Sequence, residues 1–356
     1  MKVLITGICG FVGSTLAAGL RQAATDWEIL GLDNLLREGS EANRLPLKRQ
    51  GVKVIHADIR MASDVTSLPP ADWVIDAAAN ASVLAGLGYG CGSRQLIEHN
   101  LFGTVNLLEY CKQHRAGFLL LSTSRVYSLR SLAGLEMEVA HQAYVPKANG
   151  VFPEGFSPRG VSEGFSTAPP VSLYGNSKLA SESLALEYGE MFEFPVWINR
   201  CGVMAGAGQF GRPDQGVFAY WINGYLRGLP LKYLGFGGTG FQVRDCFHPR
   251  DLVTLLRRQM EQPAAPRSRI QNISGGSQQS LSLAQLSEWC AARFGRREIQ
   301  REPVGRPFDV PWLVLDATQA GNQWGWEPRT SLETILTEIA RHAEQNPHWL
   351  ELSGVL

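Results

Sequence analysis

Short apolar runs rich in β-branched residues recur along the first 200 residues and alternate with longer stretches of helical spacing. The runs cover residues 2–6, 28–32, 52–56, 72–76, 117–122 and 196–200, and the main helical stretches cover residues 14–23, 93–113 and 174–192. Runs of this kind suit strands buried on both faces. The alternation therefore predicts an α/β fold with a doubly wound parallel sheet, whose ligand lies at the carboxyl ends of the strands.

A glycine turn connects the first strand to the first helix. The sequence is Gly7-Ile-Cys-Gly10-Phe-Val-Gly13. Gly7 allows a tight turn, Gly10 lets a pyrophosphate approach the backbone, and Gly13 lets the helix pack on the strand. This unit predicts a dinucleotide cradle of the Rossmann type, although a glycine triplet alone often occurs by chance.

Asp33 ends the second strand, about 20 residues after the glycine turn. A carboxylate there can accept both ribose hydroxyls of adenosine and would repel a 2′-phosphate, so we expect NAD and not NADP. The alternative is that Asp33 only caps a loop, and the nearby Arg37 weakens the discrimination against NADP. The small residues Ala77, Ala78 and Ala79, which follow the fourth strand, suit a backbone lying against a cofactor.

Regular alternation stops after residue 200, where glycines and aromatic residues dominate up to residue 241. Helical spacing returns at residues 283–294 and 331–343. We therefore predict an NAD-binding Rossmann domain over residues 1–200, completed by residues 241–276. Residues 201–240 and 277–356 are predicted to form a smaller C-terminal substrate-binding lobe.

Composition excludes several classes of partner. Of 356 residues, 44% are hydrophobic, and 33 basic residues balance 33 acidic ones. No basic run suggests nucleic acid, and apart from the glycine-interrupted N-terminus no apolar stretch is long enough for a membrane. The six scattered cysteines form no Cys-x-x-Cys motif, so we expect free thiols in a reducing cytoplasm and no metal site. An anionic substrate must be met by local arginines.

Candidate chemistry is carried by Tyr174-Gly-Asn-Ser-Lys178. Residues four apart share a helix face, so the Lys178 ammonium can favour the phenolate and lower the pKa of Tyr174 from about 10. Tyr174 is then a candidate acid/base. Thr123 ends the fifth strand and could hydrogen-bond a substrate hydroxyl beside it. The alternatives are a solvated helix face for the pair and a simple cap for Thr123.

These features together resemble the extended short-chain dehydrogenase/reductase family, which comprises NAD-dependent nucleotide-sugar epimerases and dehydratases. Further matching motifs are Asp58-Ile-Arg60, Asn100 in a polar position of the long helix, Ser122-Thr-Ser-x-Val-Tyr127, Arg244-Asp-x-x-His248 and Asn272-Ile-Ser-Gly-Gly276. The resemblance implies that Tyr174 is the acid/base, that Lys178 holds the nicotinamide ribose, and that Thr123 hydrogen-bonds the sugar.

The resemblance also assigns the binding residues. It implies NAD contacts from Gly7, Cys9, Gly10, Phe11, Val12, Gly13, Asp33, Asn34, Asp58, Ile59, Ala77, Ala78, Ala79, Asn100, Tyr174 and Lys178. It implies contacts with a nucleotide-diphosphate sugar from Asn80, Thr123, Gln215, Gly216, Arg244 and Arg306. Two alternatives stay open, since Asn100 could be exposed or structural and Arg306 could pair with Asp309.

Within the family, Asp214-Gln-Gly216 and residues 240–248 are similar to the CDP-paratose 2-epimerases. Three departures occur. Residues 205–208 lack a phosphate-binding arginine, Val203 replaces an asparagine of many 4-epimerases, and Pro311 replaces a second arginine. The long segment 128–170 is rich in Gly, Pro and Ser, which suggests a loop or lid shaped for a particular substrate.

The expected activity is therefore transient oxidation and re-reduction of a sugar carbinol, at C2 of a CDP-sugar by the resemblance. A 4-epimerase is the nearest alternative. Dehydratases of the family place Asp-Glu where this chain has Ser124 and Arg125, which argues against water elimination. A nucleotide-sensing regulator typically loses the tyrosine or the lysine. The resemblance further implies a homodimer formed through the helices near 93–113 and 174–192.

Overall fold

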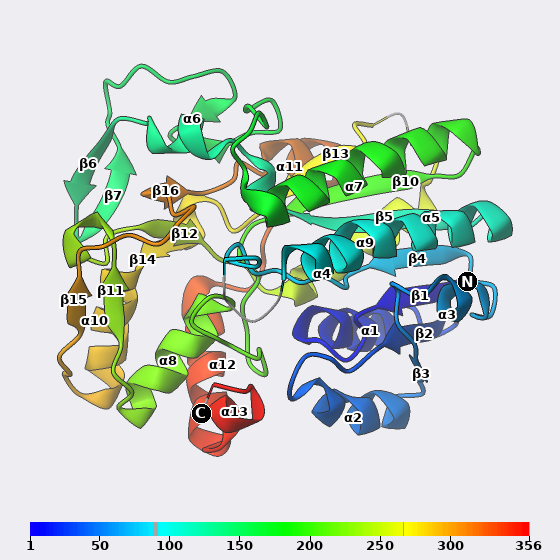
Figure 1. Cartoon of the computed structure of the whole chain (residues 1–356), viewed down its shortest axis with the longest axis horizontal. Coiled ribbons are helices and arrows are strands. Elements are labelled where there is room, and N and C mark those ends of the chain that lie inside the picture. The colour runs from blue at the N-terminus through cyan, green and yellow to red at the C-terminus, as the bar shows by residue number, and fades with distance from the viewer. Residues whose placement is uncertain (88–91, 266, 356) are drawn as a thin grey trace.

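The computed structural model describes residues 1–87, 92–265 and 267–355. In this part of the chain a parallel sheet of seven strands has the order β13-β10-β5-β4-β1-β2-β3 (Figure 1). Its strands are β1 (Lys2–Thr6), β2 (Glu28–Asp33), β3 (Lys53–His56), β4 (Trp73–Asp76), β5 (Gly117–Thr123), β10 (Val196–Cys201) and β13 (Ile270–Ile273). This confirms the predicted doubly wound α/β fold. The strand order reverses between β1 and β4, so a ligand crevice is expected at their carboxyl ends.

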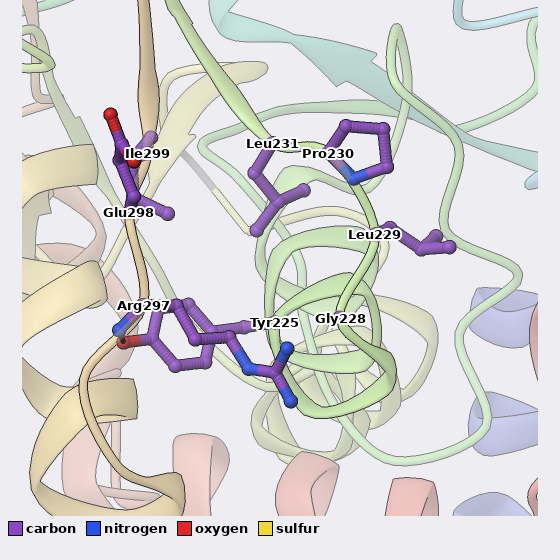
Figure 2. Close-up of a pocket in the computed structure, with 8 residues that line it drawn as sticks. All are labelled: Tyr225, Gly228, Leu229, Pro230, Leu231, Arg297, Glu298 and Ile299. Atoms are coloured by element: carbon purple, nitrogen blue, oxygen red, sulfur yellow. Dashed lines mark hydrogen bonds between the residues drawn. The ribbon is translucent and has the colours of Figure 1, made fainter.

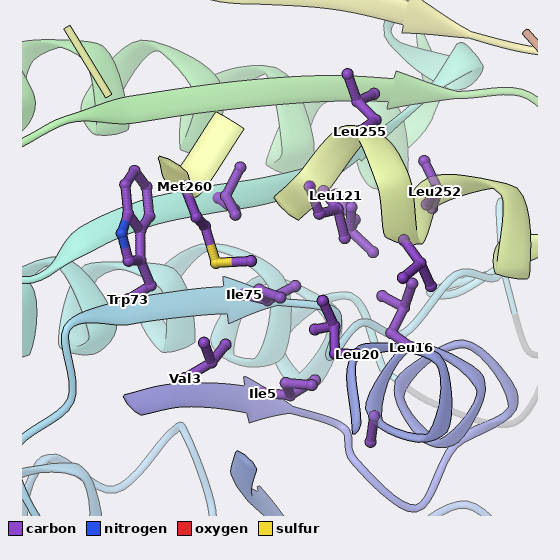
Figure 3. Packing of buried hydrophobic residues seen from close by; sticks show 14 of the residues in the cluster. Val3, Ile5, Leu16, Leu20, Trp73, Ile75, Leu121, Leu252, Leu255 and Met260 are labelled. Carbon is purple, nitrogen blue, oxygen red and sulfur yellow. The ribbon is translucent and has the colours of Figure 1, made fainter. Parts of the chain in front are cut away.

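Helices cover both faces of this sheet. On one face, α1 (Phe11–Ala23), α9 (Leu252–Glu261) and α11 (Thr318–Trp324) bury apolar side chains in one cluster. Figure 3 shows Leu16 and Leu20 of α1 and Leu252 of α9 near strand residues such as Ile75. On the other face lie α3 (Ala62–Thr66), α5 (Gly103–His114) and α7 (Ser172–Met191). This two-sided burial explains why the strand sequences are apolar without alternation.

The long helix expected over residues 93–113 is interrupted. It consists of α4 (Ser93–Ile97), a π-helical turn η2 (Glu98–Phe102) and α5. Asn100 lies within the π turn and is buried. Such turns insert an extra residue into a helix, often near functional sites. The apolar spacing of the helix gives no sign of it.

The C-terminal lobe is built around α8 (Val217–Arg227), α10 (Leu283–Phe294) and α12 (Leu332–Gln345), followed by α13 (Trp349–Leu352). Ser282 and Gln285 form a capping box that starts α10, and Ser331 caps α12. One small sheet pairs β11 (Lys232–Leu234) with β15 (Gln300–Glu302). In another, β12 (Val243–Asp245) lies between β14 (Ser280–Ser282) and β16 (Trp312–Leu313). The remaining short elements are η1 (Ser40–Asn43), α2 (Arg44–Arg49), η3 (Ser124–Val126), η4 (Phe236–Gly238), η5 (Pro249–Asp251) and η6 (Ser277–Gln279).

Segment 128–170 folds into α6 (Leu129–Ala133) and two hairpins. The hairpins are β6 (Met137–Ala140) with β7 (Ala143–Pro146), and β8 (Phe156–Ser157) with β9 (Gly160–Val161). The Val161 N–H donates to the carbonyl of Val314 at 2.9 Å, and apolar side chains of the segment pack against residues 310–315. The segment is therefore anchored to the C-terminal lobe by backbone hydrogen bonds and an apolar cluster.

Membrane insertion has no candidate among the described helices, none of which combines the length and the apolar character needed to cross a bilayer. Five cysteines are free and buried, namely Cys9, Cys111, Cys201, Cys246 and Cys290. The sixth, Cys91, lies outside the described residues.

Candidate active site

The glycine turn brings three backbone segments together. Gly7 has a φ of 60°, and a Cβ there would lie 3.0 Å from the Cα of Ala78. A Cβ on Gly13 would lie 2.2 Å from the carbonyl oxygen of Gly7, so only glycine allows α1 to start this close to β1. Gly10 is the N-cap of α1, and no side chain caps the helix. The amides of the first turn are thus suited to a pyrophosphate.

Asp33 fixes this turn. Its buried carboxylate accepts the N–H of Cys9 at 2.9 Å and the N–H of Leu35 at 2.8 Å. Burial raises the pKa of Asp33, and these hydrogen bonds counteract the rise. An ionised carboxylate can accept about four hydrogen bonds, so acceptor capacity remains for a ligand. Capping of the loop, which was the alternative role, is therefore compatible with binding a ribose hydroxyl.

Arg37 lies near Asp33 in the sequence, but its guanidinium bonds to the C-terminal lobe. It donates to the amide oxygen of Gln215 at 2.9 Å and to the carbonyl of Phe210. Burial lowers the pKa of Arg37 to about 10. The Arg37 guanidinium is therefore already engaged, which leaves it less available to bind the 2′-phosphate of NADP.

Two of the predicted NAD contacts, Asn34 and Asp58, are polar residues that follow β2 and β3. Asn34 donates to the carboxylate of Asp58 at 3.1 Å, and Arg60 forms an ion pair with Asp58 at 2.6 Å. Although burial acts in the opposite direction, the hydrogen bonds from Arg60 lower the pKa of Asp58 to about 2. The carbonyl of Ile59 accepts the side chain of Asn106 at 2.8 Å. Their contacts with NAD remain predictions.

Residues 77–80 are held between β1 and η2. The N–H groups of Ala77 and Ala78 donate to the hydroxyl of Thr6 at 3.0 and 2.9 Å. Asn100 bonds to both the N–H and the carbonyl of Asn80, at 2.8 and 2.9 Å, and donates to Ser177 at 3.2 Å. Asn100 is buried and takes the structural role that was its alternative, so a direct contact with NAD remains a prediction. Ala79 is exposed.

The three predicted catalytic residues are all buried at the carboxyl edge of the sheet. Thr123 ends β5, where it pairs in register with Cys201 of β10, and Tyr174 and Lys178 lie in the first half of α7. The side chain of Thr123 is a hydrogen-bonding neighbour of the Tyr174 phenol and lowers its pKa. The carboxylates whose charges act on Lys178 are those of Asp76 and Glu182. Thr123 also accepts the N–H of Arg125 at 3.2 Å, so it caps the next turn as well.

One electrostatic prediction is wrong for the protein chain by itself. The pKa of Tyr174 is raised above its ordinary value, because burial penalises the phenolate more than its neighbours favour it. The cation that opposes this rise is Arg125. Lys178 has its own pKa lowered by burial. Helical spacing put Lys178 on the correct face, but it could not weigh desolvation against charge.

A pocket of about 290 Å³ opens beside Thr123 and Tyr174. It is lined by residues of both lobes, including the predicted residues Val12, Thr123, Tyr174, Gln215, Gly216, Arg244 and Arg306. None of the residues 128–170 lines it, so the lid expected from that segment is not found. The backbone hydrogen bonds of the segment hold it against residues 310–316 instead.

The two predicted phosphate-binding arginines meet at Asp309. Arg244 donates to its carboxylate at 2.5 Å and to the carbonyl of Val310 at 3.0 Å. Arg306 donates to the carbonyl of Pro213 at 3.1 Å and lies 4.0 Å from Asp309. The ion pair that was the alternative for Arg306 is therefore present but long, and this side chain remains 33% exposed.

Several pocket residues were not predicted. The sequence indicates Asp309 only as an ion-pair partner of Arg306, and Arg125 only as a residue that argues against dehydration. Asp214 accepts a hydrogen bond from the hydroxyl of Ser82 at 2.6 Å, which ties the loop before α8 to the chain just after the 77–80 segment. The position of Arg125, two residues after Thr123, was the available signal.

A second cavity of about 330 Å³ lies where the end of α8 faces the connection from α10 to β15 (Figure 2). Tyr225, Leu231 and Arg297 are among its lining residues. None of the predicted site residues lines it.

Comparison with known proteins identifies the family. The model of the NAD dependent epimerase/dehydratase family matches residues 3–274. The chain belongs to this family. Its cofactor is accordingly NAD, which the glycine turn and Asp33 are suited to hold.

Relatives within the family act on different sugars. The chain is 30% identical over 348 residues to CDP-paratose 2-epimerase of Salmonella typhi, covering 93% of this chain and 96% of the relative. It is 26% identical to UDP-glucuronate 4-epimerase 2 of Arabidopsis thaliana, covering 96% and 75%. The fold is similar to that of UDP-glucuronic acid 4-epimerase from Bacillus cereus, solved with UDP-glucuronic acid and NAD. Here the TM-score is 0.74 at 23% identity, covering 97% and 99% of the two chains.

Proposed function

We propose that this family member is a nucleotide-sugar epimerase that oxidises a sugar carbinol and reduces the resulting ketone from its other face. The observation that carries this proposal is that buried Tyr174 has Thr123 as a hydrogen-bonding neighbour and lines one pocket with Val12 of the glycine turn, while Lys178 is buried one turn further along α7. NAD, when bound, supplies a hydride acceptor that becomes the donor for the return step. The cofactor ends unchanged, so it is expected to remain bound through turnover.

The protein's own residues handle the proton. The Thr123 hydroxyl orients the substrate hydroxyl, and the Tyr174 phenolate accepts its proton as the carbon gives up a hydride. Lys178 is to hold the nicotinamide ribose, and Arg125 is the cation that favours the phenolate. The ketone then turns its other face to the same hydride, and Tyr174 returns the proton to the oxygen. No atom is lost, and the configuration of one carbon is inverted.

For the substrate we propose a CDP-sugar and for the reacting carbon C2. Support comes from the 30% identity to CDP-paratose 2-epimerase along nearly the whole chain, and from the pocket position of Asp214, Gln215 and Gly216. The second candidate is a UDP-sugar 4-epimerase, which the 26% identity to UDP-glucuronate 4-epimerases favours. An NAD-sensing regulator is the non-enzymatic alternative, but the chain retains both Tyr174 and Lys178.

The test is incubation of the purified protein with CDP-, UDP-, dTDP- and GDP-sugars, with NMR detection of inverted product. Tyr174→Phe should abolish turnover on whichever sugar is accepted. Tyr188→Phe is the matched control, because Tyr188 lies on the same helix and its hydroxyl hydrogen-bonds only to Glu109 among the described residues. Undiminished turnover in Tyr174→Phe would refute the mechanism. Retained NAD binding without turnover of any sugar would favour the regulator.

We also propose a division of labour and an assembly. NAD is to be bound by residues 1–200 together with 241–276, and the sugar nucleotide by the rest of the chain. The position of β13 in the main sheet supports the inclusion of residues 241–276 in the NAD-binding part. We propose a cytoplasmic homodimer formed through the α4–α5 and α7 helices, where Phe102 and Met191 are 55% and 71% exposed. A monomer by light scattering would contradict the dimer.

A further inference from the structure

Positive charge gathers at one end of the main pocket. The pocket is lined by Arg125, Arg244, Arg306 and Asp309. The charges of the other three residues all act on the pKa of Arg125. Three guanidinium groups against one carboxylate leave a local charge of 3 − 1 = +2. The pocket's other carboxylate, Asp214, accepts from Ser82 and faces Arg37. The chain as a whole is neutral, so this local excess points to an anionic ligand.

Arg125 is the member of this group nearest to the proposed chemistry. Its N–H donates to Thr123, and its carbonyl oxygen would lie 2.2 Å from a Cβ on Gly175, the residue after Tyr174. Its backbone is therefore fixed between the threonine and the tyrosine. Its side chain makes one hydrogen bond in the described part of the chain, a long one of 3.4 Å to the carbonyl of Phe308. A guanidinium has five N–H donors, so most of its capacity remains for a ligand.

We propose that Arg125 binds an oxyanion carried by the sugar carbon next to the carbon that is oxidised. This inference rests on the proposed epimerase function. The reacting carbon must lie at Tyr174. Arg125 lines the same pocket and its charge acts on the Tyr174 phenol, so its guanidinium is placed to meet an oxyanion on the neighbouring carbon. Arg125 would thereby help to select which carbon reaches Tyr174.

Two sugar chemistries supply such an oxyanion. In an inversion at C2, the neighbouring C1 carries the diphosphate. In an inversion of a uronic acid at C4, the neighbouring C5 carries a carboxylate. A neutral hexose inverted at C4 has neither. We favour the C1 phosphate, because Arg244 and Arg306 continue the same cluster and its charge of +2 balances the roughly two charges of a diphosphate.

The first test is the kinetics of Arg125→Gln on the preferred substrate. Loss of a hydrogen bond to a charged group should lower kcat/KM by roughly 10- to 100-fold. Arg125→Lys should recover part of this loss, because lysine keeps the positive charge but lacks the planar, two-pronged donor geometry of arginine. Arg130→Gln, an exposed arginine of α6, is the control and should leave kcat/KM unchanged. Thermal unfolding and NAD content should match the wild type, and Arg125→Lys carries the test if the glutamine variant does not fold.

The second test separates the two sources of the oxyanion. If Arg125 binds the phosphate on C1, Arg125→Gln should weaken CDP binding by roughly 10-fold or more in calorimetry and leave CMP unchanged. If it binds a carboxylate, both nucleotides should bind as before, and turnover of UDP-glucuronate should fall. For an enzyme that accepts uridine sugars, UDP and UMP replace CDP and CMP.

Two results would overturn the inference. One is a kcat/KM within threefold of wild type for Arg125→Gln, together with unchanged nucleotide binding. The other is a preferred substrate that is a neutral hexose inverted at C4. Both differ from failure of the proposed function, in which the wild type inverts no sugar. In that case the calorimetry still decides whether Arg125 contacts a phosphate.

Discussion

Gly175 offers a direct test of how the candidate site is held together. In the interior of a helix, Gly→Ala ordinarily stabilises a protein by about 0.5–1 kcal/mol. At Gly175 of α7, however, the new Cβ would lie 2.2 Å from the carbonyl oxygen of Arg125 and 3.3 Å from the Cβ of Val171. The oxygen belongs to the backbone of η3, so it cannot rotate away as a side chain would.

The required displacement follows from these distances. Ordinary contact begins at 3.4 Å, so α7 and η3 must separate by about 1 Å to accept the methyl group. Overpacking of this kind costs about 1–3 kcal/mol, which outweighs the helical gain. The separation also moves Tyr174 away from Thr123. A misplacement of about 1 Å at a reacting group can lower the rate about 100-fold. We therefore expect Gly175→Ala to lower both the unfolding free energy and kcat.

Urea unfolding and initial rates of epimerisation measure the two effects. Gly321→Ala in α11 is the matched control, because its nearest contact would be the carbonyl of Trp326 at 3.5 Å. That variant should be as stable as the wild type or more so, by up to about 1 kcal/mol, with unchanged kcat. If Gly175→Ala behaves like Gly321→Ala in both assays, the close approach of α7 to η3 is not what aligns the site.

Three further outcomes are expected. Glu182→Gln should cost about 3–5 kcal/mol in urea unfolding, because it leaves the buried guanidinium of Arg200, now bonded at 2.7 Å, without its carboxylate. His248 has its pKa lowered to about 3 by burial, so the unfolded chain binds the extra proton. The free energy of unfolding should therefore fall by a few kcal/mol as the pH drops from about 6.5 towards 3, and the full stability is present above about pH 6.5. His248→Asn should make this pH dependence weaker. Because the pKa of Tyr174 is raised, kcat should increase with pH above neutrality, and Arg125→Gln should move the midpoint higher.

Much of the fold followed from local sequence. The strand at residues 2–6, the glycine turn and Asp33 are close in the chain, and each has a backbone reason for its residue type. The carboxyl ends of parallel strands share one edge, so Thr123 could be placed at the ligand-binding edge of the sheet without coordinates. Its role beside Tyr174, which lies on a helix, was implied by the family resemblance. Periodicity and spacing carry this information, because both depend on near neighbours in the chain.

The features that were missed depend on long-range pairing or on burial. Arg37 meets Gln215 across 178 positions, and no local pattern indicates that contact. The hairpins of segment 128–170 read as a loop because strands of two to four residues leave little periodicity. The direction of the Tyr174 pKa shift depends on how deeply α7 is buried, which spacing along a helix does not show.

Burial also explains why the charges around Tyr174 must be considered as one set. Desolvation raises the cost of the phenolate, and the same low-dielectric surroundings strengthen every nearby charge. Lys178 faces the carboxylates of Asp76 and Glu182, and Arg125 faces Asp309. An oxyanion bound to Arg125 would reduce the help that this cation gives to the phenolate. The residue that we infer selects the reacting carbon would then also make the basicity of Tyr174 depend on the substrate.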